Sequence, residues 1–110
     1  MDVIKVAGSS RTSAVAGAIA GVYREYHRAE VQAIGAGAVN QAVKALVLAK
    51  SYLERDGYQI ACIPQFSDVE IDGKVRTAIK FYVLEHTGDL PPEITGSLGD
   101  GQLEADDSEM

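Results

Sequence analysis

The sequence predicts an α/β domain with the order β-α-β-α-β-β, in which a mixed four-stranded sheet carries two helices on one face. An apolar run followed by a helical pattern occurs twice before Gly57, with short loops, which is typical of a parallel β-α-β start. Two long extended segments then flank Asp72-Gly73, the strongest short signal of a β-hairpin. With 110 residues and 46% hydrophobic content, we expect one domain with a real core.

The first strand and helix are predicted from an apolar run and a helical stripe. Residues 3–7 are apolar and partly β-branched and end at Gly8, which indicates a strand. A polar turn follows, in which Ser10, Thr12 or Ser13 can cap a helix. The helix is expected from about residue 12 to residue 28. Its expected inward stripe, at a spacing of about 3.6 residues, is Val15, Ala18, Ile19, Val22 and Tyr26.

A second strand and helix are separated by a glycine turn. The strand is expected over residues 30–34, and Gly35 and Gly37 remove side chains where the backbone turns. The helix is expected from about residue 38 to residue 55 and ends at Gly57, a favoured residue just after a helix. Its expected inward residues are Val39, Ala42, Val43, Leu46, Val47 and either Tyr52 or Leu53. The small residues of both helices predict close packing against a neighbour.

The remaining strands form the predicted hairpin, with arms at residues 58–71 and 74–85. Pro64 interrupts the first arm, which favours an edge position or a bulge because proline cannot donate to a strand ladder. The second arm alternates as a half-buried strand should. Its expected inward residues are Thr77, Ile79, Phe81 and Val83.

The charge is unevenly distributed along the chain. All ten Lys and Arg residues precede residue 90, whereas six of the sixteen acidic residues follow it. Residues 1–89 therefore carry no net charge, and the rest carries the whole −6. We predict a folded domain over residues 1–87 and an acidic, disordered tail over residues 88–110. That tail either folds back on a basic face and competes with nucleic acid, or only raises solubility.

Several classes of protein are not expected. The single cysteine, Cys62, cannot form an internal disulfide, which fits the reducing cytoplasm, and it is expected to be a small buried hydrophobe rather than a nucleophile. No apolar run is long enough for a membrane span, and the first residues lack the layout of a signal peptide. His27 and His86 have no partner at a recurring spacing, and no zinc or calcium motif is present. We therefore expect no enzyme, no metal and no cofactor.

The start of the second helix is a candidate anion site. Asn40, Gln41 and Lys44 are expected near its first exposed turns, where free N–H groups and the positive end of the helix dipole favour an anion. Tight packing of the helix on the sheet explains the two glycines without any ligand. A small phosphorylated ligand at residues 35–40 is a further alternative.

Several motifs resemble the stage V sporulation protein S family of bacteria over roughly residues 2–85. They are Ile4-Lys-Val6, Ser13-Ala-Val-Ala-Gly-Ala18, Glu30-Val-Gln-Ala-Ile-Gly-Ala-Gly-Ala-Val-Asn-Gln-Ala-Val-Lys-Ala45, Cys62-Ile-Pro64, Ile71-Asp-Gly73 and Arg76-Thr-Ala-Ile-Lys80. That family is similar in fold to the Alba chromatin and RNA-binding proteins. The resemblance implies an Alba-like fold, a homodimer and binding of DNA or RNA.

The resemblance also implies where nucleic acid is contacted: the first strand–helix loop, the start of the second helix and the hairpin. The candidate residues at these places are Ser9, Ser10, Arg11, Gly37, Asn40, Gln41, Lys44, Lys74 and Arg76. A dimeric nucleic-acid-binding regulator of sporulation type is thus the first hypothesis for function. The alternative is a non-enzymatic protein-interaction or assembly module on the same fold, for which the neutral body and the small-residue helices are partner surfaces.

Overall fold

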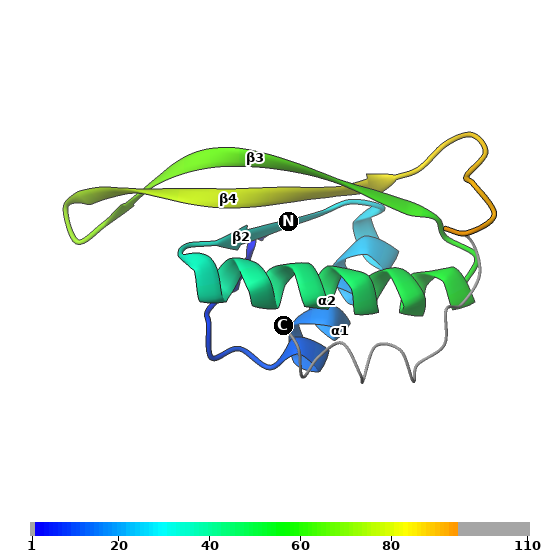
Figure 1. Cartoon of the computed structure of the whole chain (residues 1–110), viewed down its shortest axis with the longest axis horizontal. Coiled ribbons are helices and arrows are strands. Elements are labelled where there is room, and N and C mark those ends of the chain that lie inside the picture. Colours follow the sequence, from blue (N-terminus) through cyan, green and yellow to red (C-terminus); the bar gives the residue numbers. More distant parts are fainter. Residues whose placement is uncertain (1, 95–110) are drawn as a thin grey trace.

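The structure is a computed structural model that describes residues 2–94. Its element order is the predicted one, β-α-β-α-β-β (Figure 1). The elements are β1 Ile4–Val6, α1 Thr12–Tyr26, β2 Ala29–Ala33, α2 Ala36–Arg55, β3 Ile60–Ile71 and β4 Lys74–Glu85.

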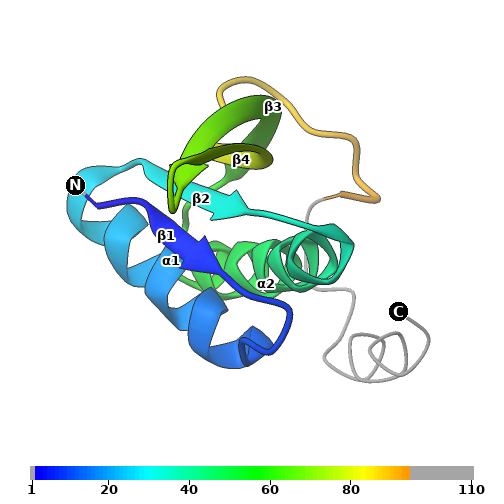
Figure 2. The ribbon, with the colours of Figure 1, turned by 90° about the vertical axis from the view of Figure 1, so that its left-hand side faces the viewer.

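The four strands form one mixed sheet in the order β1-β2-β4-β3. β1 and β2 are parallel, as the helical crossover between them requires, and the other pairs are antiparallel. Val31 in the middle of β2 pairs with Ile4 on one side and Phe81 on the other. Both helices pack on β1 and β2 from the same side of the sheet, while the long hairpin curves away from them (Figure 2). The predicted fold class is therefore confirmed.

The ends of the helices follow from a few backbone positions. α1 ends at Tyr26, two residues before the predicted end, because His27 adopts a left-handed conformation with φ 57°. α2 begins at Ala36, two residues before the predicted start, because Gly35 makes the whole turn with φ 90°. Gly57 ends α2 as predicted, with φ 87°. Its N–H donates to the Glu54 carbonyl at 3.0 Å, which satisfies one of the last carbonyls of the helix.

The core is built largely from alanines where the two helices meet each other and the sheet. The buried helical residues are Val15, Ala16, Ile19, Ala20 and Tyr23 of α1, and Ala38, Ala42, Ala45, Leu46, Ala49 and Leu53 of α2. The predicted close packing is confirmed, since α1 and α2 contact each other directly.

The predicted inward stripes were partly wrong. Ala18 is exposed, and Tyr26 is 52% exposed, while Tyr23 takes the buried place. On α2, Val43 and Val47 are 37% and 45% exposed, although both were predicted to face inward. The predicted stripes follow the largest apolar residues. The helices instead meet through their alanines, because small side chains allow the closest approach, and this turns the larger ones outward.

The hairpin has the predicted turn. Asp72 and Gly73 have φ values of 52° and 78°, as a two-residue turn with both central residues left-handed requires. Pairing runs without a break from Ile60 with Glu85 to Ile71 with Lys74, so the strand that contains Pro64 has no bulge. β3 is an edge strand, which confirms the edge position predicted from the proline.

The predicted inward face of β4 is right for Phe81 and Val83, which are buried, but wrong for Thr77, which is exposed. Cys62 was also predicted to be buried and is exposed. The two differences have separate causes: Thr77 lies beyond the last residue of β4 that pairs with β2, whereas Cys62 lies level with β2 but on the edge strand β3.

Residues 86–94 follow β4 and lie near the end of α2 (Figure 1). Lys50 Nζ donates to the carbonyl of Ile94 at 3.0 Å and also to Glu54 Oε2 at 2.9 Å. Most of the predicted acidic tail, residues 95–110, lies outside the described residues, so the boundary at residue 87 stays a prediction. Over the described part of the chain, neither helix has the length and apolar character needed to cross a membrane.

Candidate nucleic-acid interface

The first loop and the start of α2 lie against each other, although they are far apart in the sequence. A Cβ placed on Gly8 would lie 3.7 Å from the carbonyl carbon of Gly37, which is van der Waals contact between the two backbones. The loop thus passes directly over the first turn of α2. The structure therefore brings together Ser9, Ser10 and Arg11 with Gly37, as the candidate site requires.

Gln41 ties the two segments together. Its Nε2 donates to the carbonyl of Ser10 at 2.7 Å and to Thr12 Oγ1 at 3.2 Å, and both bonds are partly buried. Ser10 is held from the other side as well, since its N–H donates to the Ala7 carbonyl at 3.0 Å and its Oγ accepts from the Ala7 N–H at 2.9 Å. Ser10 and Gln41 thus shape the loop. The predicted cap from Ser10, Thr12 or Ser13 is wrong, since α1 has no side-chain cap and the Thr12 hydroxyl accepts from Gln41 instead.

The first loop connects the starts of the two helices: Gly8 lies against Gly37 in the first turn of α2, and Gln41 in the second turn of α2 bonds to Thr12, where α1 begins. Neither start has a side-chain cap, and neither first turn contains an acidic residue. Ser13, Ala36 and Gly37 are exposed, so the first turn of each helix borders solvent. The partial positive charge at each helix start favours an anion near the end of the loop that adjoins it.

Arg11 and Lys44 add full charges to this surface. Arg11 is exposed directly before α1 and makes no ion pair within residues 2–94. Asn40 and Lys44 follow on α2, one and two turns after its start, and both are half-buried. Ion pairs within residues 2–94 join Arg24 with Asp56 at 2.7 Å, Arg28 and Lys80 with Glu30 at 3.1 and 3.4 Å, and Lys50 with Glu54 at 2.9 Å.

The two hairpin candidates stand apart from this group. Lys74 and Arg76 are exposed near the tip of the hairpin, which projects past the helices at the end of the molecule where α2 begins (Figure 1). The neighbouring acids Asp68, Glu70 and Asp72 offset their charge. The hairpin can therefore reach a long ligand that lies on the first loop, but it contributes little net positive charge.

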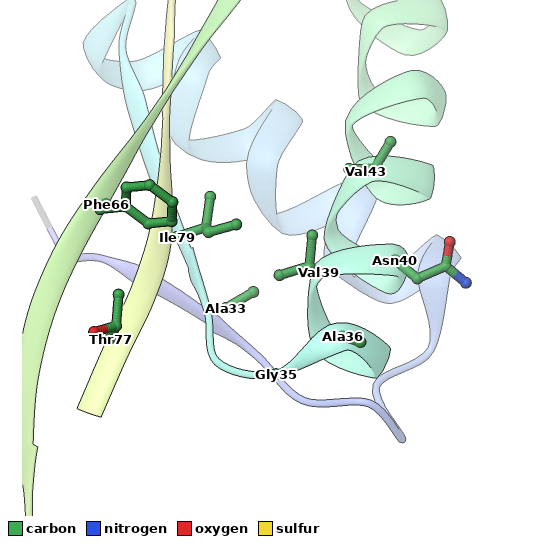
Figure 3. Close-up of a pocket in the computed structure, with 9 residues that line it drawn as sticks. All are labelled: Ala33, Gly35, Ala36, Val39, Asn40, Val43, Phe66, Thr77 and Ile79. Atoms are coloured by element: carbon green, nitrogen blue, oxygen red, sulfur yellow. The ribbon is translucent and has the colours of Figure 1, made fainter.

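An apolar groove of about 520 Å³ lies between α2 and the hairpin (Figure 3). Its lining residues are Ala33, Gly35, Ala36, Val39, Asn40, Val43, Phe66, Thr77 and Ile79. Phe66 is the most exposed large apolar residue within residues 2–94, at 77%, and it stands on the hairpin wall opposite Val39 and Val43. We call Val43, Val47 and Phe66 the apolar face. This face was not predicted, although Val43 and Val47 stand one helical turn apart and Phe66 lies on the proline-marked strand.

The described residues offer no other obvious chemistry. Between residues 2 and 94, no three His, Cys, Asp or Glu side chains gather closely enough to hold a metal ion. Whether the chain is an enzyme is not tested by this, and the expectation of no catalysis stays a prediction.

Comparison with known families decides what kind of protein this geometry belongs to. The family model of stage V sporulation protein S (SpoVS) matches residues 2–86. The chain belongs to the SpoVS family. The match includes every strand and helix described above and all nine candidate residues, and it leaves residues 87–110 outside. SpoVS membership makes this a sporulation-related protein and confirms the resemblance found in the sequence.

Proposed function

We propose that this SpoVS protein is a nucleic-acid-binding regulator that acts as a dimer in the cytoplasm and has no catalytic activity. It binds phosphates through the first loop, with Ser9, Ser10 and Arg11, and through the start of α2, with Gly37, Asn40, Gln41 and Lys44. Lys74 and Arg76 of the hairpin add a second, weaker region of contact. The bound polymer is DNA or RNA, since both present the same phosphates.

The observation that carries the proposal is the bond from Gln41 Nε2 to the Ser10 carbonyl, 2.7 Å long. It holds the loop, with exposed Arg11 at the uncapped start of α1, against the first two turns of α2. Such a surface offers both backbone N–H groups and a guanidinium. These groups donate strong hydrogen bonds to phosphate oxygens. A preformed arrangement of donors also lowers the conformational cost of binding.

The proposal predicts a definite role for salt. Each cation that neutralises a phosphate adds about 0.9 to the slope of log affinity against log salt on duplex DNA. Arg11 and Lys44, one of each per subunit, therefore give a dimer about four such contacts before the hairpin is counted. The affinity should fall steeply as salt rises.

The test is fluorescence anisotropy with labelled duplex DNA and single-stranded RNA over a salt series. Arg11→Ala and Lys44→Ala should each weaken binding by about three- to tenfold at low salt and lower the salt slope. Arg24→Gln is the matched control, because it removes one positive charge near the other end of α1, and it should change affinity less than about twofold. Equal losses in all three variants would show that only net charge matters, and no binding at low salt would overturn the proposal.

The apolar face favours the second candidate, an assembly module. Val43, Val47 and Phe66 leave apolar side chains in water beside a groove, which is typical of a contact surface for protein. On this view the chain self-associates or binds partner proteins independently of salt and has no affinity for nucleic acid. The same anisotropy experiment separates the two candidates. Within the first proposal, the apolar face is the contact between the two subunits.

A further inference from the structure

We propose that residues 95–110 regulate the proposed nucleic-acid interface by competing with phosphates for it within the same chain. This inference rests on the proposed function, because it needs that interface to exist. It concerns a segment outside the SpoVS match, which ends at residue 86. Three features support it: the charge of the segment, the place where it begins and the length of chain available.

The charge of the segment is opposite to that of the interface. Residues 95–110 contain no Lys or Arg. Their acidic residues are Asp100, Glu104, Asp106, Asp107 and Glu109. A run of like charges stays in contact with water and is attracted to a surface of opposite charge, because burying it in a core would be costly. The body up to residue 89 is neutral as a whole, so such a surface exists only where its cations gather.

The segment begins beside α2, the helix that carries half of the interface. Lys50 Nζ donates a hydrogen bond of 3.0 Å to the carbonyl of Ile94, although the two residues are 44 positions apart. Lys50 follows Lys44 by six residues on the same helix, which is about 9 Å along the axis. The start of α2 is fourteen residues away from Lys50, or about 21 Å.

The length of the segment matches these distances. An extended chain spans at most about 3.3–3.6 Å per residue, so Asp100 can lie up to about 20 Å from Ile94. The four acids from Glu104 to Glu109 can lie up to about 33–50 Å away. A flexible linker of twelve residues has a typical span of about 19 Å, close to the distance to the start of α2. Tethering at a matched span gives an effective concentration in the millimolar range.

The competition should be moderate and sensitive to salt. Each exposed pair of opposite charges is worth little, and the Debye length is only about 10 Å at 0.1 M salt. Several such pairs at millimolar effective concentration should lower nucleic-acid affinity by about three- to tenfold at low salt. Nucleic acid has the higher charge density and displaces the segment once it is abundant.

The first test uses the full chain with all five acids changed to amides, as D100N, E104Q, D106N, D107N and E109Q. Its matched control exchanges the same residues without loss of charge, as D100E, E104D, D106E, D107E and E109D. At about 50 mM salt the amide variant should bind labelled DNA or RNA about three- to tenfold more tightly than the original chain. The control should bind like the original, and the gap should close by about 0.5 M salt.

The outcomes separate this inference from the proposed function. Equal binding by all three proteins overturns the competition and leaves the proposed function standing. No binding by any of them at low salt overturns the proposed function. A gap that persists at high salt contradicts an electrostatic competition between the segment and the phosphates.

A second measurement locates the segment without nucleic acid, because losing five negative charges also changes the general field of the protein. A nitroxide is attached to Ser108→Cys in a Cys62→Ser background, and paramagnetic broadening of backbone amide signals is recorded by NMR. The signals of Arg11, Gly37 and Lys44 should broaden at low salt and recover in the amide variant. Broadening that is absent, or that is uniform over the domain, overturns the inference even if the affinities differ.

Discussion

Gln41 gives the proposed interface its shape without carrying any charge. Gln41→Ala removes the donor to the Ser10 carbonyl and to Thr12 Oγ1, and both bonds are partly buried. We expect a loss of about 1–2 kcal/mol in the free energy of unfolding, because a partly buried acceptor is left without its partner. Nucleic-acid affinity should fall as well, at unchanged net charge, because the loop is no longer held. Urea unfolding and anisotropy measure the two effects.

Gln65→Ala is the control for this variant. Gln65 is exposed on the edge strand β3, so its loss should change neither stability nor affinity appreciably. If Gln41→Ala lowers stability but leaves affinity at the level of the Gln65→Ala protein, the loop is not part of the interface.

Tyr23 is a second residue with a testable role, this time in the core. Its side chain is fully buried, and its hydroxyl has no hydrogen-bond partner within the described part of the chain. The ring packs edge-on against Tyr58 at 5.5 Å and stacks with His27 at 5.9 Å. Tyr23→Phe keeps these ring contacts and removes only the buried hydroxyl. We expect the free energy of unfolding to rise by about 1 kcal/mol at neutral pH.

The same variant predicts a pH dependence. Burial raises the pKa of Tyr23, with smaller contributions from the negative charge of Glu85 and from Tyr58. Below the unfolded-state value of about 10, the group is protonated in both states and its contribution is complete. Above that value the unfolded chain releases its proton first, so stability is lost as pH rises. The unfolding midpoint should therefore drop less between neutral pH and about pH 10.5 in Tyr23→Phe than in the original chain, because the variant lacks this one titrating group. If the midpoints of the two proteins drop equally, the loss of stability at high pH does not come from Tyr23.

At the scale of the elements, Gly57 shows how a single backbone angle ends α2. The N–H of Tyr58 donates to the Leu53 carbonyl at 2.9 Å, and the turn depends on a φ of 87° at Gly57. A Cβ there would meet no atom within 4 Å, so any cost of Gly57→Ala comes from the backbone angle alone. We expect a loss of about 1 kcal/mol in the free energy of unfolding.

Gly17→Ala is the matched opposite. Gly17 lies inside α1, and a Cβ there also meets nothing within 4 Å. Alanine is favoured over glycine in a helix, so this variant should gain about 0.5–1 kcal/mol. Thermal unfolding monitored by circular dichroism should show the two variants shifted in opposite directions. Shifts of the same sign would show that the angle at Gly57 is not the controlling feature.

The elements themselves could be predicted well, because each depends on local signals. Asp72-Gly73 and Gly57 supply backbone angles that few other residues adopt, and Pro64 marks an edge strand, so turns and ends follow directly from the sequence. The inward faces of the helices could not be predicted with the same success. Val43 and Val47 are outside because α2 meets α1 through alanines, and that depends on how two distant segments pack.

The candidate site was predictable only as a set of separate segments. The glycine turn and the resemblance to SpoVS pointed to residues 9–11 and 37–44, but nothing local joins them. The bonds from Gln41 to Ser10 and Thr12 bridge sequence distances of 31 and 29 residues, so only the folded chain reveals them. The same holds for the groove, whose walls come from α2 and the hairpin.

On the scale of the whole molecule, the apolar face adjoins the groove between α2 and the hairpin. The lining of that groove also includes Gly35, Ala36 and Asn40 at the start of α2, whereas Gln41 of the same helix bonds to the first loop. Phe66 and Cys62 are four residues apart on β3, so both face the helix side of the sheet. A second subunit seated on the apolar face would cover Phe66 and reach towards Cys62.

Phe66→Lys therefore tests the proposed dimer. A lysine in the middle of the apolar face would have to be buried without a partner, which costs several kcal/mol and should convert a dimer to monomers. Sedimentation equilibrium over a range of protein concentrations measures the change. Val75→Lys is the matched control, because Val75 is also a large exposed apolar residue, at 68%, but lies near the hairpin tip away from α2. It introduces the same charge and should leave the dimer intact.

The rate at which a thiol reagent modifies Cys62 adds an independent measure of the same contact. In the original chain the rate should fall as protein concentration rises through the dimer range, because the second subunit shields β3. In Phe66→Lys it should stay at the monomer value at every concentration. If the original chain sediments as a monomer at high concentration, or if Val75→Lys dissociates it as fully as Phe66→Lys, the apolar face is not the contact between subunits. That result would favour the assembly-module hypothesis, in which the apolar face binds a different protein.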